Sequence, residues 1–165
     1  MLPLFCVSAD VATEALPHQR LDHGEFLHVQ TEIARAIMHI LIADDHASVR
    51  HGLIEVLADA MPEARFIEAC NGDEVIQHLA GAEFSVLLMD INMPGRSGLD
   101  VLPEVKRNYP NIPVVMVSVQ PEDQYAMRCL RAGAAAYVNK DRATEELVPV
   151  VRKVLADCRC TSLRN

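Results

Sequence analysis

The sequence has no tryptophan and few other aromatic residues: aromatic side chains make up 4% of its 165 residues, whereas 50% are hydrophobic. A core without large rings must be built from Val, Ile, Leu, Ala and Met, which is typical of parallel strands covered by helices on both faces. A chain of this length has enough residues for one sizeable core and would be cramped as two complete domains. The composition therefore predicts one α/β domain with tails.

Positive charge is also scarce. The formal net charge is −8 at pH 7, and a negative chain repels nucleic-acid phosphates, whose binding rests on clustered Lys and Arg. We therefore expect no DNA contact by this chain alone. Any contact with DNA would need a further domain.

Long hydrophobic runs are missing as well. No apolar stretch approaches the ~18 residues that a membrane span needs. The short apolar start, Met1 to Ala9, has no basic region and is followed by Asp10, unlike a signal peptide. The five cysteines are scattered and odd in number, so reduced thiols are expected, and Cys158 with Cys160 is too isolated a pair for a metal site. These features predict a cytoplasmic protein that contacts no membrane.

The first 37 residues show no sustained hydrophobic period, and only Phe26 to Met38 could form an amphipathic helix. We expect residues 1–37 to be a loose extension. Because Met38 directly precedes the first strong strand, the segment could also be translated from an upstream start codon and add no function. The folded domain is predicted over 38–157, and 158–165 as a polar tail or the start of a linker.

From Met38 onward, short apolar runs alternate with longer segments of helical period, which is the pattern of β-α repeats around a parallel sheet. The predicted strands are His39 to Ala43, Arg65 to Ala69, Phe84 to Met89, Pro113 to Val117 and Ala136 to Asn139. The predicted helices are Ser48 to Ala60, Asp73 to Ala80, Leu99 to Asn108, Glu122 to Ala132 and Thr144 to Ala156. Strict alternation of this kind predicts a doubly wound, five-stranded parallel sheet with five helices.

Polar side chains stand at the carboxyl ends of four of these strands. Asp44 and Asp45 end the first strand and Asp90 the third. Ser118 ends the fourth strand and Lys140 the fifth. In an open α/β sheet, ligands bind beyond the carboxyl ends of the strands, so we expect these groups to share one site.

Three neighbouring carboxylates repel one another, and protonation or a divalent cation relieves the repulsion. Hard oxygen ligands with room for water suit Mg²⁺, which commonly joins one or two carboxylates to a phosphate. Lys140 would add a second positive charge. A carboxylate flanked by Mg²⁺ and an ammonium group can attack phosphorus, because both cations neutralise the oxygens of the phosphoryl group in transfer.

These residues belong to a larger set with a recognisable pattern. The set consists of Asp44-Asp45, the run Met89-Asp90-Ile91-Asn92-Met93-Pro94-Gly95, then Gly98, Ser118 and Tyr137-Val138-Asn139-Lys140. It resembles the signature of the response-regulator receiver domains of two-component signalling and covers about Met38 to Ala156. Each element alone is weak, but the set is specific. The resemblance implies a flavodoxin-like, chemotaxis-type fold with strand order 2-1-3-4-5.

The resemblance also implies a phosphorylation switch and not an enzyme, although the domain would assist its own phosphorylation and dephosphorylation. Asp90 would accept a phosphoryl group from a sensor histidine kinase. Asp45, Asp90 and the backbone carbonyl of Asn92 would ligate Mg²⁺ directly, with Asp44 helping through water. Lys140 would pair with the phosphoryl group.

In the same pattern, the Ser118 hydroxyl would bond the phosphoryl group and Tyr137 would follow Ser118 inward. This movement would alter the surface formed by the fourth helix, the fifth strand and the fifth helix, which would carry the output. A homodimer on phosphorylation is one expected form of that output.

Two positions depart from the family pattern. Val119 stands where members usually have Ala or Gly, which could narrow the access to Asp90. Asp141 stands where many members have Pro, so a Pro-type cis bond is not implied. The finer resemblance, based on Ala43-Asp44-Asp45-His46, Gly133-Ala134 and Tyr137 to Asp141, is to the NarL/FixJ-type subfamily. Its members continue into a LuxR-type helix-turn-helix domain, so transcription would be regulated through a domain beyond this chain.

Plainer explanations exist for each residue. Adjacent Asp residues at a strand end usually form a turn or a helix cap, Ser118 could cap a helix, and Tyr137 could be a core residue with a bonded hydroxyl. We expect His46 and His51 to face solvent or pack locally.

Two other functions remain open. An aspartate-nucleophile hydrolase also uses Asp with Mg²⁺ and Lys, but phosphatases of that kind have a second Asp two residues later, where this chain has Asn92. A receiver-like interaction module that does not turn over phosphate is the second alternative, with Val119 as the obstruction. Phosphorylation by acetyl phosphate would separate it from a working receiver.

Overall fold

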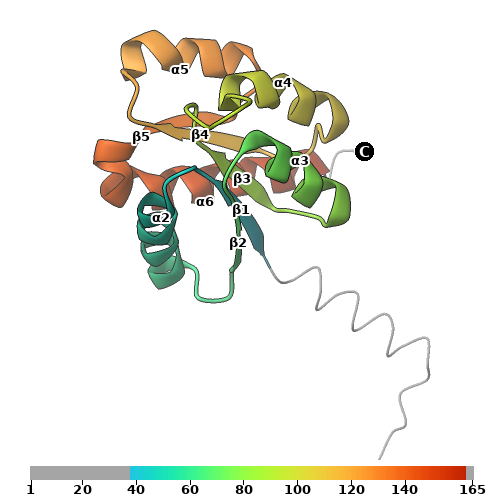
Figure 1. Ribbon diagram of the computed structural model, residues 1–165. Helices are drawn as coiled ribbons and strands as arrows, with labels where there is room; N and C mark the ends of the chain where they lie inside the picture. The colour runs from blue at the N-terminus through green and yellow to red at the C-terminus, as the bar shows by residue number, and fades with distance from the viewer. Residues whose placement is uncertain (1–37, 163–165) are drawn as a thin grey trace, which may run out of the picture. The chain divides into compact units, whose positions relative to one another are not determined.

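The computed structural model describes residues 38–162, which form a layered α/β unit (Figure 1). The strands are β1 (His39–Ala43), β2 (Arg65–Ala69), β3 (Val86–Met89), β4 (Val114–Ser118) and β5 (Ala136–Asn139). The helices are α2 (Ala47–Ala60), α3 (Gly72–Gly81), α4 (Gly98–Asn108), α5 (Glu122–Arg131) and α6 (Ala143–Ser162), with a 3₁₀ turn, η1 (Lys140–Arg142), before α6.

All five strands pair in parallel in the order β2-β1-β3-β4-β5. The predicted doubly wound, flavodoxin-like sheet is therefore confirmed, including its strand order. β1, β3 and β4 are buried almost throughout, because helices cover both faces of the sheet and leave its central strands no exposed side.

The helices divide into two layers, which Figure 1 shows on opposite sides of the sheet. Leu57 of α2 and Val151 of α6 belong to one apolar core cluster. Val75 of α3, Leu102 of α4 and Cys129 of α5 belong to the other. Each helix packs one apolar face against the sheet, so the strands are buried between the two clusters.

Most differences from the predicted boundaries are one or two residues. The largest concerns the last helix, which was predicted to end at Ala156 but continues to Ser162. No Gly or Pro follows Pro149 in this stretch, so nothing in the local sequence breaks the helix. The predicted polar tail therefore begins as helix. The expected loose extension, residues 1–37, lies outside the described residues, and so does the stretch from Phe26 that could form a helix, apart from Met38.

No helix within residues 38–162 is long and apolar enough to cross a membrane.

Candidate functional site

Asp44 and Asp90 lie side by side because their strands are neighbours. Ala43 of β1 pairs with Met89 of β3, and the Asp90 N–H donates to the Ala43 carbonyl over 2.8 Å. Each aspartate is the next residue after its strand, so both project from the carboxyl edge of the sheet. Asp44 is 1% exposed and Asp90 3% exposed, which makes each of them a buried carboxylate that needs a partner.

Lys140 is that partner for both. Its Nζ lies 2.5 Å from Asp44 Oδ2 and 3.0 Å from Asp90 Oδ2, and its side chain is 11% exposed. Burial, the largest single influence, would lower the pKa of Lys140, but the pairing with Asp44 and Asp90 outweighs it and the pKa is raised. Lys140 is therefore held as a cation between two carboxylates, at the place where the sequence predicted a shared site.

Asp45 points outward beside this pair and contacts a histidine. The His46 ring Nδ1 lies 2.7 Å from Asp45 Oδ1 and 3.4 Å from Asp44 Oδ1. The His46 backbone N–H also donates to Asp44 Oδ1 over 2.8 Å. The Asp45 side chain is 33% exposed and that of His46 67%. The expectation that His46 faces solvent is thus right for most of the ring, but its contacts with the two aspartates were not foreseen.

Arg50, a residue that the sequence reasoning missed, fixes the backbone of Asp44. Arg50 is 8% exposed. Its Nη1 donates to the Asp44 carbonyl over 2.7 Å and its Nε to Glu68 Oε2 over 2.6 Å. The sequence did contain a sign of this role. The buried residues of α2 are Arg50, Leu53 and Leu57, so Arg50 lies on the apolar face of the helix, where an unpaired charge is seldom found.

The loop after Asp90 is closed by a glycine. Asp90 Oδ1 accepts the Ile91 N–H over 2.7 Å, and the Gly98 N–H donates to the Ile91 carbonyl over 2.9 Å. A Cβ on Gly98 would lie 2.0 Å from the Asp90 carbonyl oxygen, so only glycine allows this approach. Ser97 then starts α4 with a capping box. Asn92, within the same loop, is exposed.

Ser118 and Tyr137 are both tied to Gln120, at the end of β4. Ser118 is fully buried, and its Oγ accepts the Gln120 N–H over 3.4 Å. The Tyr137 hydroxyl donates to the Gln120 carbonyl over 2.6 Å, and burial, the largest cause, raises the pKa of Tyr137 to about 12. Gln120 was not predicted to take part, because its contribution is made by the backbone.

The two departures from the family pattern lie at the surface. Val119 is 57% exposed and lines, with Lys140 and residues of α2, a pocket of about 290 Å³. Asp141 lies in η1, where its N–H donates to Asn139 Oδ1 over 2.9 Å. Every peptide bond among the described residues is trans.

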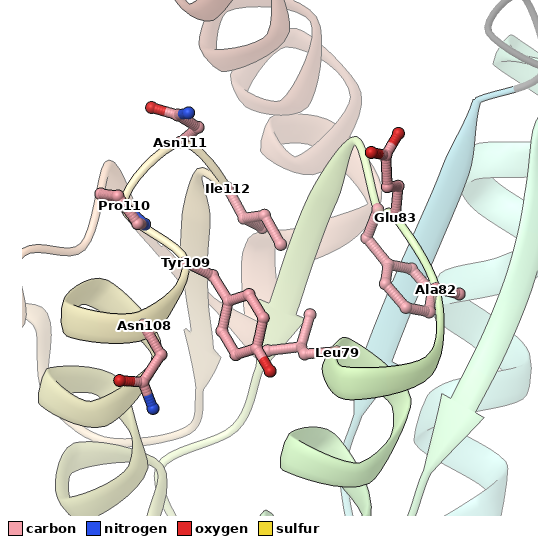
Figure 2. Close-up of a pocket in the computed structure, with 9 residues that line it drawn as sticks. Leu79, Ala82, Glu83, Asn108, Tyr109, Pro110, Asn111 and Ile112 are labelled. Atoms are coloured by element: carbon pink, nitrogen blue, oxygen red, sulfur yellow. The ribbon is translucent and has the colours of Figure 1, made fainter.

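A second pocket, of about 400 Å³, lies at the opposite edge of the sheet (Figure 2). Leu79, Phe84, Tyr109 and Ile112 form its apolar lining, with Glu83 at its rim. These residues precede β3 and β4 or end helices, whereas the aspartates follow the strands. The pocket is therefore separate from the acidic site, and none of the predicted site residues lines it.

The residues present fit a divalent metal ion. Asp44 Oδ2 is buried, and its partner among the described residues is Lys140, whose Nζ lies 2.5 Å away. Ligand atoms of Asp44, Asp45 and His46 also lie within 4.8 Å of one another. Carboxylate oxygens and a backbone carbonyl are the ligands that Mg²⁺ prefers, and a divalent cation would offset the negative charge that Lys140 alone leaves on Asp44, Asp45 and Asp90.

The order of the strands and the aspartates with Lys140 at their carboxyl ends are found together in one protein family. Residues 40–152 match the family model of the response regulator receiver domain. The chain therefore belongs to this family, and the predicted membership is confirmed.

Known response regulators are similar to this chain in sequence and in fold. Response regulator GacA from Pseudomonas aeruginosa is 36% identical over 126 residues, which cover 76% of this chain and 59% of GacA. Response regulator TrrA from Thermotoga maritima, solved in complex with Mg(2+)-BeF, is 26% identical with a TM-score of 0.64 over 71% of this chain and 98% of that chain. A DNA-binding response regulator of the LuxR family from Staphylococcus aureus is 28% identical with a TM-score of 0.64 over 72% and 98%.

The chain spans only about three fifths of the length of the curated relatives that it matches. The comparisons thus identify a receiver domain of a response regulator.

Proposed function

We propose that Asp90 is the phosphoryl acceptor of this receiver, that it is loaded from a phosphohistidine of a sensor kinase in the presence of Mg²⁺, and that the domain acts in the cytoplasm. The observation that carries the proposal is the contact of Lys140 Nζ with both Asp44 and Asp90. An acceptor carboxylate needs a fixed position and a nearby cation, and Asp90 has both.

The proposed transfer forms one bond and breaks one. A carboxylate oxygen of Asp90 bonds to phosphorus while the N–P bond of the phosphohistidine breaks, and the leaving imidazole takes the electron pair and a proton. Lys140 neutralises negative charge on the phosphoryl group during the transfer. The Ile91 N–H holds Asp90 Oδ1, so that the carboxylate keeps one orientation.

Asp45, Asp90 and the carbonyl of Asn92 would hold Mg²⁺, with Asp44 helping through water. When bound, the ion would neutralise charge on the phosphoryl oxygens. The same groups would position water for loss of the phosphoryl group, which makes the domain a switch that assists its own phosphorylation and dephosphorylation.

The proposed switch consists of Ser118 of β4 and Tyr137 of β5. Ser118 would release Gln120 and bond the phosphoryl group, and Tyr137 would give up its bond to the Gln120 carbonyl and follow inward. The surface of α5, β5 and α6 would change as a result. In the whole protein this change would promote a homodimer or control a further, DNA-binding domain; a DNA-binding response regulator of the LuxR family is among the structures that the chain resembles.

Phosphorylation by acetyl phosphate tests the proposal. Intact-mass measurement should show the gain of one phosphoryl group in the wild type with Mg²⁺ and no gain in Asp90→Asn. Asp59→Asn is the matched control, because Asp59 is exposed on α2, and it should be phosphorylated like the wild type. No gain in a folded wild type at saturating acetyl phosphate and Mg²⁺ would favour the inert interaction module.

A further inference from the structure

His46 presents a ring nitrogen to two carboxylates, and the proposed function makes no use of it. Nδ1 lies 2.7 Å from Asp45 Oδ1 and 3.4 Å from Asp44 Oδ1. Two oxygens and one nitrogen thus converge from three consecutive residues at the end of β1, and their ligand atoms lie within 4.8 Å of one another.

The backbone makes this convergence more than a chance surface ion pair. The His46 backbone N–H donates to Asp44 Oδ1, so the backbone of the histidine is held beside the buried carboxylate. Arg50 Nη1 donates a hydrogen bond to the Asp44 carbonyl. The other oxygen of Asp44, Oδ2, is buried and contacts Lys140 Nζ at 2.5 Å, so Asp44, Asp45 and Asp90 together carry more negative charge than the one lysine offsets.

The separations match those of metal ligands. Two ligands that are each about 2.1 Å from one ion lie roughly 3 Å apart, close to the two distances from Nδ1. His46 Nδ1 and Asp45 Oδ1 are therefore close enough to coordinate the same metal ion. The exposed ring leaves room for water at the remaining positions.

The ligand atoms of Asp44, Asp45 and His46 differ from those of an all-oxygen site because one of them is a nitrogen. Mg²⁺ is a hard cation that takes oxygen ligands, whereas imidazole favours the later first-row dications, whose affinities rise from Mn²⁺ to Cu²⁺. A site with one imidazole and two carboxylates therefore binds such ions more tightly than it binds Mg²⁺.

We propose that His46, with Asp44 and Asp45, forms a site for a later first-row transition-metal dication, and that His46 is the residue that gives the acidic site this selectivity. The site shares two aspartates with the proposed Mg²⁺ site, but it does not depend on phosphoryl transfer. A transition metal bound here competes with Mg²⁺ for the same carboxylates.

Titration calorimetry with Ni²⁺ and, separately, with Mg²⁺ tests the proposal on the full chain at about pH 8, where free imidazole is neutral. His46→Gln removes the ring nitrogen and leaves the start of α2 intact, because the His46 side chain makes no capping bond. His51→Gln is the matched control: His51 also contacts a carboxylate, with Nε2 3.5 Å from Glu55 Oε1, but it lies away from the aspartates.

His46→Gln should weaken Ni²⁺ binding by at least about tenfold, since changes around a metal site commonly cost that much, and should leave Mg²⁺ binding unchanged. His51→Gln should alter neither. The proposal is overturned if His46→Gln leaves Ni²⁺ binding intact, if Ni²⁺ and Mg²⁺ binding fall together, or if His51→Gln has the same effect. Phosphorylation of Asp90 is measured separately, so failure of the receiver mechanism would leave the Ni²⁺ result standing.

Discussion

Arg50 Nη1 donates a hydrogen bond of 2.7 Å to the backbone carbonyl of Asp44, while Arg50 Nε pairs with Glu68 at 2.6 Å. One buried guanidinium therefore joins α2, β2 and the residue that follows β1. The pKa of Arg50 is raised, first by its hydrogen bond to Glu68, so the group remains charged and its bond to Asp44 is charge-assisted.

Replacing Arg50 should disturb both stability and the acidic site. Arg50→Met removes charged hydrogen bonds and is expected to lower the free energy of unfolding by about 2 kcal/mol, as measured by urea denaturation. It should also slow phosphorylation by acetyl phosphate, because the backbone of Asp44 loses its anchor. Arg152→Met is the control, since Arg152 also donates to a backbone carbonyl, that of Ala60, but does so at the surface. Equal phosphorylation rates in the two variants would contradict the anchoring role.

Gly98 should not tolerate a methyl group. A Cβ there would lie 2.0 Å from the Asp90 carbonyl oxygen, so Gly98→Ala must displace the loop after Asp90 and is expected to cost at least about 2 kcal/mol of stability. Gly52→Ala has no atom within 4 Å of the new Cβ and lies in a helix, where Ala is favoured over Gly by about 0.8 kcal/mol. Thermal unfolding should therefore move in opposite directions for the two variants. A neutral Gly98→Ala would show that the approach to Asp90 is not tight.

Tyr137 should titrate late. Burial raises its pKa to about 12 from an ordinary value near 10, so the folded state favours the neutral phenol. Because the folded-state pKa is raised, its contribution to stability is complete below about pH 10 and is lost as the pH rises toward 12. Ultraviolet titration of the wild type should show a tyrosine that ionises near pH 12 and that is missing from the titration of Tyr137→Phe. If Tyr137→Phe instead loses a tyrosine signal near pH 10, the burial of this hydroxyl is contradicted.

Val119 should slow phosphorylation without preventing it. Its exposed side chain shares a pocket with Lys140, so Val119→Ala should open the approach to Asp90. We expect the rate with acetyl phosphate to rise by roughly threefold to tenfold, which corresponds to about 1 kcal/mol in the barrier. Met127→Ala removes another exposed apolar side chain, on α5, and should leave the rate unchanged. If Val119→Ala phosphorylates at the wild-type rate, the side chain is no obstacle.

Much of the fold could be predicted from the sequence, because alternation of apolar runs and helical segments is a local signal. β1, β2 and β5 begin and end where the sequence predicted. The predicted third strand began at Phe84, but β3 begins at Val86. Phe84 instead lines the pocket at the opposite edge of the sheet, because an apolar residue can be buried just outside a strand as well as within it.

The site was predictable in part. Strand ends alone place Asp44, Asp90 and Lys140 together, since parallel strands deliver their carboxyl ends to one edge. The contacts of Arg50 and of Gln120 with this site run through backbone carbonyl and N–H groups, which residue types do not reveal. The orientation of His46 depends on the turn after β1 and likewise had no signal in its spacing.

The central claim, that Asp90 is the phosphoryl acceptor, is tested most directly by locating the modification. Peptides of the wild-type protein incubated with acetyl phosphate and Mg²⁺ should carry one acid-labile phosphoryl group, and tandem mass spectrometry should place it on Asp90, with loss of the signal when Mg²⁺ is chelated. A phosphoryl group found on another residue, or a folded protein that stays unmodified with Mg²⁺ present, would contradict the account.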